Sequence, residues 1–346
     1  MIDRAQSDRL RMLRLPLIAG VVFIHASTLP PPGSGAYTID AKTLAQLLLS
    51  DGVARLAVPI FFLMAGFFLY GHGAWSGATY LEKLKARART LLLPMVLWNA
   101  LSLGLFAASQ AHPATARYFS GSTVIANFGP MDYGNALLGV SALPIAHQFW
   151  FIRDLIVMVI VSPLLLLAVK AAPKVTLALM ASLWLLTAKP YPIPAPEAAL
   201  FFSVGLFCRA RGLSLFSLDG RTRFLLWPYL LLLLATPAYL GQPYGLALRK
   251  LEIALGVPVA LWLTGLGSPS GKARAFLLRF ATASFFIFAA HEPLLTIVKK
   301  LLPSVISAPL AVYLLAPVIV IVALLLSHAA LHKLSPRLMR LLAGSR

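Results

Sequence analysis

The sequence has few charged residues and almost no cysteine. Cys208 is the single cysteine among 346 residues, which excludes an internal disulfide and disfavours a zinc–thiolate site. Charged residues make up 12% of the chain, about half the share of an average soluble protein. Because no hydrophilic block of domain size exists, we expect a single membrane domain over residues 1–346, without a separate soluble domain, and no bound metal.

Several sequence signatures are also missing. The chain has no Walker phosphate-binding loop, no Rossmann glycine fingerprint and no Gly-x-Ser-x-Gly elbow, which disfavours ATP-driven transport by this chain and α/β-hydrolase chemistry. Acidic residues number 11 against 30 lysines and arginines, giving a formal net charge of +19. A charge of this size can indicate nucleic-acid binding. Here the charges form short clusters between apolar runs, as in cytoplasmic loops, so we expect no nucleic-acid partner.

Apolar residues dominate what is present. They make up 59% of the chain, and its mean hydropathy is +0.83. A membrane-spanning helix needs about 20 mostly apolar residues. The sequence therefore predicts an all-α integral membrane protein with about ten transmembrane helices, at 12–30, 52–71, 90–110, 149–169, 175–190, 197–212, 223–241, 246–266, 277–298 and 308–330.

The basic residues predict the orientation of these helices. With the N-terminus inside, segments on the inner side hold 21 of the 30 lysines and arginines, and segments on the outer side hold 7. This bias places both termini in the cytoplasm. Arg14 and His25 border the first apolar run, and many spans follow, so we interpret this run as a retained helix and not as a cleaved signal peptide.

Two ionisable residues of the first span point to a cavity. Such groups cost several kcal/mol in the hydrocarbon zone and mark functional cavities, although some only join helices by hydrogen bonds. Arg14 and His25 are eleven residues apart, which places them on one helix face about 16 Å apart along the axis. One long ligand could therefore place an anionic end at Arg14 and a reactive end at His25.

The ninth span repeats the pattern. His291 lies twelve residues after Arg279, about 18 Å into the helix, and Glu292 follows it. A neutral imidazole can take a proton from a hydroxyl, and a carboxylate can orient that imidazole. We interpret the remaining histidines, which lie near loops or at the inner end of the last span, as structural: His72, His112, His147, His328 and His332.

Two further groups have alternative interpretations. Arg55, Trp150, Arg153 and Asp154 lie in outer halves of their spans, where they could bind a carbohydrate or form an aromatic belt with a helix–helix salt bridge. A basic run precedes the third span and could hold the phosphates of coenzyme A, or anchor the chain on the inner side. This run comprises Lys83, Lys85, Arg87 and Arg89.

Five segments in order resemble the membrane-bound acyltransferase-3 family, which includes O-acetyltransferases of bacterial lipopolysaccharide, exopolysaccharide and nodulation factors. They are Arg14-x10-His25, the run from Arg55 to Gly66, Arg89 with the following Leu-Leu-Leu-Pro94, Gln148-Phe-Trp-Phe-Ile-Arg153, and Ala290-His-Glu-Pro-Leu294. The motifs extend across the membrane core at residues 13–330. One departure is Ala65-Gly66, where members often have Ser-Gly.

The resemblance implies about ten helices in a bacterial inner membrane and transfer of an acyl group, commonly acetyl, from coenzyme A. The acceptor would be a hydroxyl of an envelope glycan or lipid-linked saccharide. By resemblance, His25 would be the essential histidine with Arg14 as its partner. From the residues themselves, we expect His291 and Glu292 to assist, Arg14, Arg87 and Arg89 to bind the donor, and Arg55, Trp150, Arg153 and Asp154 to line the acceptor route. Direct transfer and an acyl-histidine intermediate both stay open.

Two rival classes explain part of the same pattern. A transporter or flippase of a lipid-linked saccharide would also use buried arginines and histidines. Transporters, however, often carry paired inverted repeats with broken helices, and the sequence has no convincing pair. A structural scaffold would explain the hydrophobicity but not two histidines at matched depth. We therefore expect a membrane-bound acyltransferase that uses acyl-coenzyme A.

Overall fold

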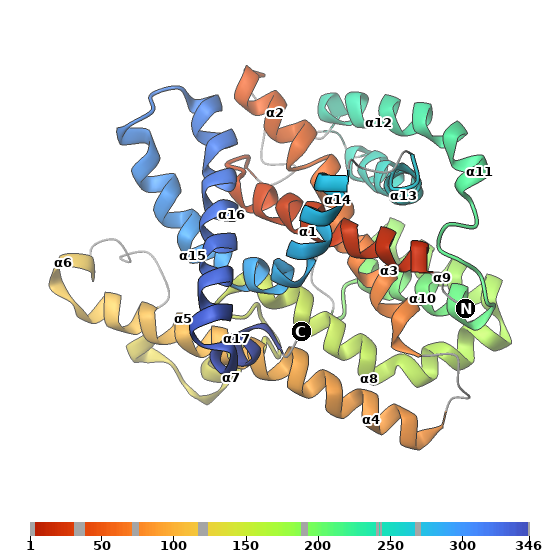
Figure 1. Cartoon of the computed structure of the whole chain (residues 1–346), viewed down its shortest axis with the longest axis horizontal. Helices are drawn as coiled ribbons and strands as arrows, with labels where there is room; N and C mark the ends of the chain where they lie inside the picture. Colours follow the sequence, from red (N-terminus) through yellow and green to blue (C-terminus); the bar gives the residue numbers. More distant parts are fainter. Residues whose placement is uncertain are drawn as a thin grey trace.

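The computed structural model describes residues 4–30, 39–70, 76–116, 124–187, 193–239, 242, 244–266 and 271–344. Every regular element in these ranges is helical, which confirms the all-α prediction (Figure 1). The α-helices are α1 (Arg4–Ala26), α2 (Ala41–Leu49), α3 (Ala57–Leu69), α4 (Gly77–Arg87), α5 (Leu93–Ala111), α6 (Pro113–Ala116), α7 (Pro130–Leu138), α8 (Trp150–Ala171), α9 (Pro173–Leu186), α10 (Pro196–Ala210), α11 (Asp219–Thr222), α12 (Leu226–Tyr239), α13 (Gly245–Leu263), α14 (Gly271–Phe280), α15 (Ser284–Leu301), α16 (Pro309–Leu334) and α17 (Pro336–Ala343).

Each of the ten predicted spans overlaps helical residues, although 52–71, 175–190 and 223–241 end outside the described residues. By length and composition, 5 helical stretches can cross a membrane. They are Ala41–Leu69, Gly77–Ala111, His147–Ala171, Gly271–Ser304 and Pro309–Leu334, and the shorter apolar helix Pro173–Leu186 accompanies them. The protein is thus a membrane protein with several apolar helices, while the number of ten spans and the cytoplasmic termini stay predictions.

The outer surface of the helices is apolar. Leu164 of α8, Trp227 and Leu231 of α12, and Leu326 of α16 each expose about 70% of their surface. Large apolar side chains this exposed on several helices are expected of a protein that contacts lipid.

Helix α1 crosses the middle of the molecule, with α15 and α16 on one side and α3 on another (Figure 1). Its apolar residues Leu10, Leu13, Leu17 and Val21 recur at helical spacing and are buried. Val22 is completely buried as well, so α1 is covered on most sides. Polar side chains in the second half of this helix, such as His25, are therefore largely covered by protein, whereas Arg11 near its start is exposed.

Helices α3 and α10 pack so closely that their glycines are necessary. A Cβ atom added to Gly66 would collide with the carbonyl oxygen of Phe202, and one added to Gly205 would collide with that of Leu63. Small residues at such crossings let two membrane helices approach closely. The Ala65-Gly66 pair that departs from the usual Ser-Gly therefore keeps the glycine that the packing requires.

Helices α4 and α5 are joined through a π-helical turn over Ala88–Leu92. Pro94 follows this turn and has no backbone N–H to offer the preceding turn of the helix. π-Helical turns occur frequently at functional sites. Here the turn comes directly after Arg87, a residue that contributes to the cavity described next.

Candidate active site

A cavity of about 590 Å³ lies between α1, α3, α8 and the segment that leads into α15. Its walls are mainly apolar and aromatic, with Val21, Phe61, Met64, Phe151 and Phe288 among them. The volume lies within the range of small-molecule sites, which are mostly apolar and carry a few placed polar groups. The polar groups of this cavity are therefore the residues to examine.

Two arginines mark one region of the cavity. Arg14 of α1 and Arg87 of α4 both line it and lie close enough to repel each other. Neither forms an ion pair with a carboxylate within the described ranges. Two unpaired guanidinium groups in a mainly apolar cavity form a site for an anion such as a phosphate. Arg89, which was also predicted to bind the donor, is exposed and does not line the cavity.

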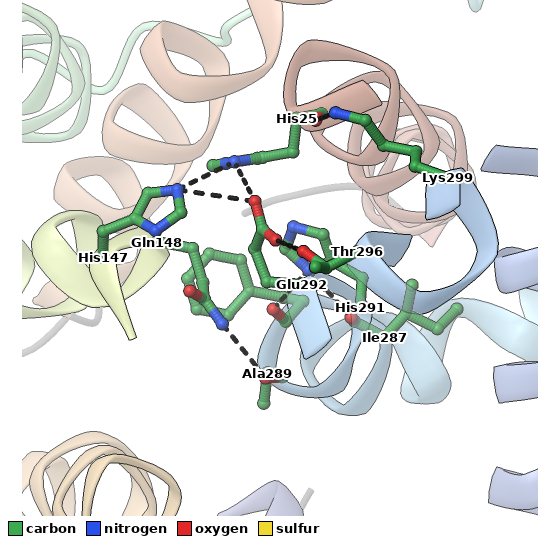
Figure 2. A network of polar contacts seen from close by, with 10 residues as sticks. His25, His147, Gln148, Ile287, Ala289, His291, Glu292, Thr296 and Lys299 are labelled. Carbon is green, nitrogen blue, oxygen red and sulfur yellow. Dashed lines mark hydrogen bonds and ion pairs between the residues drawn. The ribbon is translucent and has the colours of Figure 1, made fainter. Parts of the chain in front are cut away.

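His25 lines the same cavity, as its spacing from Arg14 on α1 predicts. Because α1 is continuous over Arg4–Ala26, the two residues lie about 16 Å apart along its axis. His25 Nδ1 lies 3.1 Å from Glu292 Oε1 (Figure 2). With a proton on Nδ1, His25 donates to this carboxylate, and its Nε2 is then the basic nitrogen.

Glu292 is held in place from its other side. Thr296, one turn later on α15, donates its hydroxyl to Glu292 Oε2 at 3.2 Å. Lys299 of the same helix donates to the backbone carbonyl of His25 at 3.2 Å, which ties α15 to the end of α1 (Figure 2). The carboxylate is thus placed to orient the His25 imidazole, the geometry expected for an oriented general base.

His291 lies next to this pair but not in the cavity wall. Its ring centroid is 5.0 Å from that of His25, and it is completely buried. Its Nδ1 donates to the carbonyl of Phe288 at 2.7 Å, and its buried Nε2 has no hydrogen-bond partner. The His291 ring therefore packs against the His25 ring, while the hydrogen-bond partner of His25 is Glu292.

The structure brings a third histidine to the site, against the sequence-based interpretation of His147 as structural. Its Nε2 lies 3.2 Å from His25 Nδ1 and 3.5 Å from Glu292 Oε1 (Figure 2). His147 belongs to the turn that precedes α8, and a loop position alone gave no reason to connect it with α1. The signal was its place directly before the Gln148-Phe-Trp motif.

Gln148 belongs to that motif but is not among the predicted site residues. It lines the cavity and donates its Nε2 to the Ala289 carbonyl at 3.3 Å. Its Oε1 is buried without a partner, and so is the Oγ of Ser284, another residue of the wall. Both oxygens are therefore buried polar atoms that lack a hydrogen-bond partner within the described residues, on side chains that border the cavity.

The predicted acceptor residues divide into two pairs. Arg55 and Trp150 line the cavity. The Arg55 guanidinium is anchored by Asp51, at 3.0 Å from Nη2 to Oδ1, and its side chain remains partly exposed. Both residues are placed to contact a ligand there.

Arg153 and Asp154 do not line the cavity, in contrast to the prediction for the acceptor route. They form a buried ion pair at 2.8 Å. Arg153 Nη1 also donates to the carbonyls of Gly139 and Ala142, and Asp154 Oδ2 accepts from the Ala195 backbone N–H. The alternative interpretation, a structural salt bridge, therefore fits this pair, because its hydrogen bonds join α8 to two loops.

The other histidines lie away from the cavity. His112 is exposed at the end of α5, and His328 and His332 lie one turn apart on α16 with ring centroids 6.1 Å apart. This placement agrees with a structural role. His72 lies outside the described residues.

An anion site and an oriented base along one cavity suit the transfer of a group from an anionic donor. Comparison with known proteins agrees with this chemistry. The family model described as "Acyltransferase domain" matches residues 8–328. The chain therefore belongs to this family, the membrane-bound acyltransferase-3 family, and is an enzyme that transfers acyl groups.

A relative with a curated description covers the whole chain. It is the succinoglycan biosynthesis protein ExoH of Rhizobium meliloti (strain 1021), which is 29% identical over 362 residues, with 100% of this chain and 94% of the relative covered. No solved structure matches the chain.

Proposed function

We propose that the protein transfers an acyl group, most simply acetyl, from cytoplasmic acyl-coenzyme A to a hydroxyl of a cell-envelope polysaccharide or its lipid-linked precursor. Membership of the acyltransferase family supports the reaction class. The description of the relative as a succinoglycan biosynthesis protein supports a polysaccharide acceptor. The observation that carries the proposal is the single cavity that joins the unpaired Arg14 and Arg87 to His25.

The donor lies along α1 in this proposal. Its phosphates bind Arg14 and Arg87, where charge-assisted hydrogen bonds replace the missing carboxylate partners. Its extended arm follows the apolar wall toward His25 and passes the side chains of Gln148 and Ser284. The thioester carbonyl then lies beside the imidazole.

His25 acts as general base in the transfer step. Its Nε2 takes the proton of the acceptor hydroxyl as the oxygen attacks the thioester carbonyl. The tetrahedral intermediate collapses, the carbon–sulfur bond breaks, and the imidazolium returns the proton to the departing thiolate. Glu292 stabilises the transient imidazolium through its contact with Nδ1, and the His291 ring packs against the His25 ring. An acyl-histidine route would use the same Nε2 as the nucleophile.

The acceptor enters on the side of Arg55 and Trp150. An aromatic face and an arginine fork suit the apolar face and the hydroxyl groups of a sugar ring. With both termini in the cytoplasm, this side faces out of a bacterial inner membrane. The enzyme thereby joins a donor made inside the cell to an acceptor outside it.

The test is transfer by purified protein in nanodiscs, supplied with radiolabelled acetyl-coenzyme A and a panel of polysaccharide and lipid-linked saccharide acceptors. Wild type is compared with His25→Ala, Arg14→Ala and, as a control, exposed His112→Ala. We expect acceptor-dependent labelling that His25→Ala abolishes and His112→Ala retains. Full transfer by well-folded His25→Ala would remove this residue from the mechanism. The absence of both donor binding and turnover with every acceptor would instead favour a transporter of a lipid-linked saccharide.

A further inference from the structure

Three potential metal ligands converge at the end of α1. His25 Nδ1, His147 Nε2 and Glu292 Oε1 lie within 4.8 Å of one another and come from three separate segments of the chain (Figure 2). The sides of the triangle measure 3.1 Å from His25 to Glu292, 3.2 Å from His25 to His147 and 3.5 Å from His147 to Glu292.

These sides match one face of a zinc coordination tetrahedron. Zinc binds histidine nitrogen and carboxylate oxygen at about 2.0–2.2 Å in tetrahedral geometry. The edge of a regular tetrahedron is about 1.6 times the distance from its centre to a corner, so neighbouring ligand atoms lie about 3.3–3.6 Å apart. The observed sides need to change by a few tenths of an ångström at most, which small side-chain rotations supply.

Hydrogen bonding does not account for the short contact between the two imidazoles. When each neutral ring donates its N–H to Glu292 Oε1, His25 Nδ1 and His147 Nε2 face each other at 3.2 Å with no hydrogen bond between them. A cation near the centre of the triangle would use the lone pairs of all three atoms at once. Two neutral imidazoles and one carboxylate are also a ligand set that zinc takes in proteins with an open fourth position.

The surroundings support a bound cation. Thr296 holds the second oxygen of Glu292, which is the outer-shell contact that keeps a metal-binding carboxylate in place. The His147 side chain is 49% exposed, so an ion and a water ligand can reach the fourth position. Lys299 directs its ammonium group to the backbone carbonyl of His25 and not to a ligand atom.

We propose that His25, His147 and Glu292 form a binding site for Zn²⁺ with a fourth position open to water. This site departs from the expectation of no metal, which considered thiolate ligands and counted His147 as structural. Metal on Nδ1 keeps the imidazole proton on Nε2, the nitrogen that must accept a proton during transfer. Bound zinc and catalysis by His25 therefore exclude each other. This exclusion rests on the proposed function, whereas zinc binding itself does not.

The experiment measures zinc directly. The full chain is purified with a tag free of histidine, placed in nanodiscs, stripped with a chelator, and titrated with Zn²⁺ by calorimetry. Metal retained after gel filtration is counted by mass spectrometry, and Co²⁺ absorption reports the coordination number. We expect one zinc per chain, four-coordinate Co²⁺, and a loss of at least about tenfold in affinity for both His147→Gln and Glu292→Gln.

Two matched variants locate the bound metal. His112→Gln makes the same change at an exposed histidine and should leave zinc affinity unchanged. His332→Gln removes one member of the histidine pair on α16, which could bind zinc by itself. Zinc lost in His332→Gln but kept in His147→Gln, zinc kept equally in all variants, or no zinc retained by folded wild type would each overturn the proposal. Bound zinc without inhibition of transfer would count against His25 as the base and not against the metal site.

Discussion

Replacing Glu292 by glutamine tests the central contact of the site with a minimal change of shape. The amide oxygen can still accept the hydrogen bond from His25 Nδ1, which spans 3.1 Å in the wild type. What disappears is the negative charge beside the imidazolium that forms in the transition state. At this separation and an effective dielectric constant of about 20, Coulomb's law gives about 5 kcal/mol.

The expected kinetic effect follows from this energy. A general base contributes about 10²–10⁴-fold to a rate, or about 3–5 kcal/mol, which agrees with the electrostatic figure. We expect kcat of Glu292→Gln to fall by about 10²–10⁴-fold. Donor affinity should be unchanged, because in the proposed function the donor phosphates bind at Arg14 and Arg87, away from Glu292.

The assay is release of coenzyme A in the presence of an acceptor, with donor affinity measured separately by calorimetry. Glu82→Gln makes the same chemical change on the exposed surface of α4 and should retain wild-type kcat. If Glu292→Gln keeps wild-type kcat while His25→Ala is inactive, Glu292 does not act through His25. A fall in donor affinity alone would place Glu292 in binding and refute the same reasoning.

Three further outcomes follow from the structure. Arg14→Ala should raise KM for acyl-coenzyme A, and the difference from wild type should shrink as added salt screens the wild-type site. Exposed Arg89→Ala should leave KM unchanged, and an equal rise of KM in both variants would contradict the assignment of Arg14. Gly205→Ala should lower the unfolding temperature in detergent, because its Cβ would collide with the Leu63 carbonyl, at a cost of about 1–3 kcal/mol. Gly104→Ala, where a Cβ meets nothing within 4 Å, serves as its control, and equal unfolding temperatures would refute the close crossing. Asp154→Asn should lower the free energy of unfolding by about 3–5 kcal/mol, because it breaks a buried ion pair. The folded fraction should keep the wild-type KM for the acceptor, and a raised KM would show that Asp154 contacts the acceptor.

The sequence predicted the helices and one side of the site because both depend on local periodicity. Arg14 and His25 belong to one helix, so their shared face and their separation follow from helix geometry alone. The apolar runs predicted where helices occur for the same reason, but 5 helical stretches of the described residues are long and apolar enough to cross a membrane, so the number of ten spans stays a prediction.

The remaining partners depend on tertiary packing. His147 reaches His25 from a segment 122 residues away, and Glu292 from one 267 residues away. Arg153 faces loop carbonyls and not the cavity because α8 is rotated so that Trp150 and Phe151 line the wall instead. Pattern and charge counts contain no information about that rotation.

Helix α1 determines the distance between Arg14 and His25. Arg14 and His25 are carried by one helix, with Pro16 between them, so a shift of a neighbouring helix does not by itself change the spacing of these two residues. Inserting one residue between them would move His25 by about 1.5 Å and turn it by about 100°, away from the cavity. If the donor binds as proposed, the rise of α1 sets the distance from its phosphates to its carbonyl, whatever acyl group the donor carries. Under that proposal, the residues that select among acyl groups lie beyond His25, at the far side of the carbonyl.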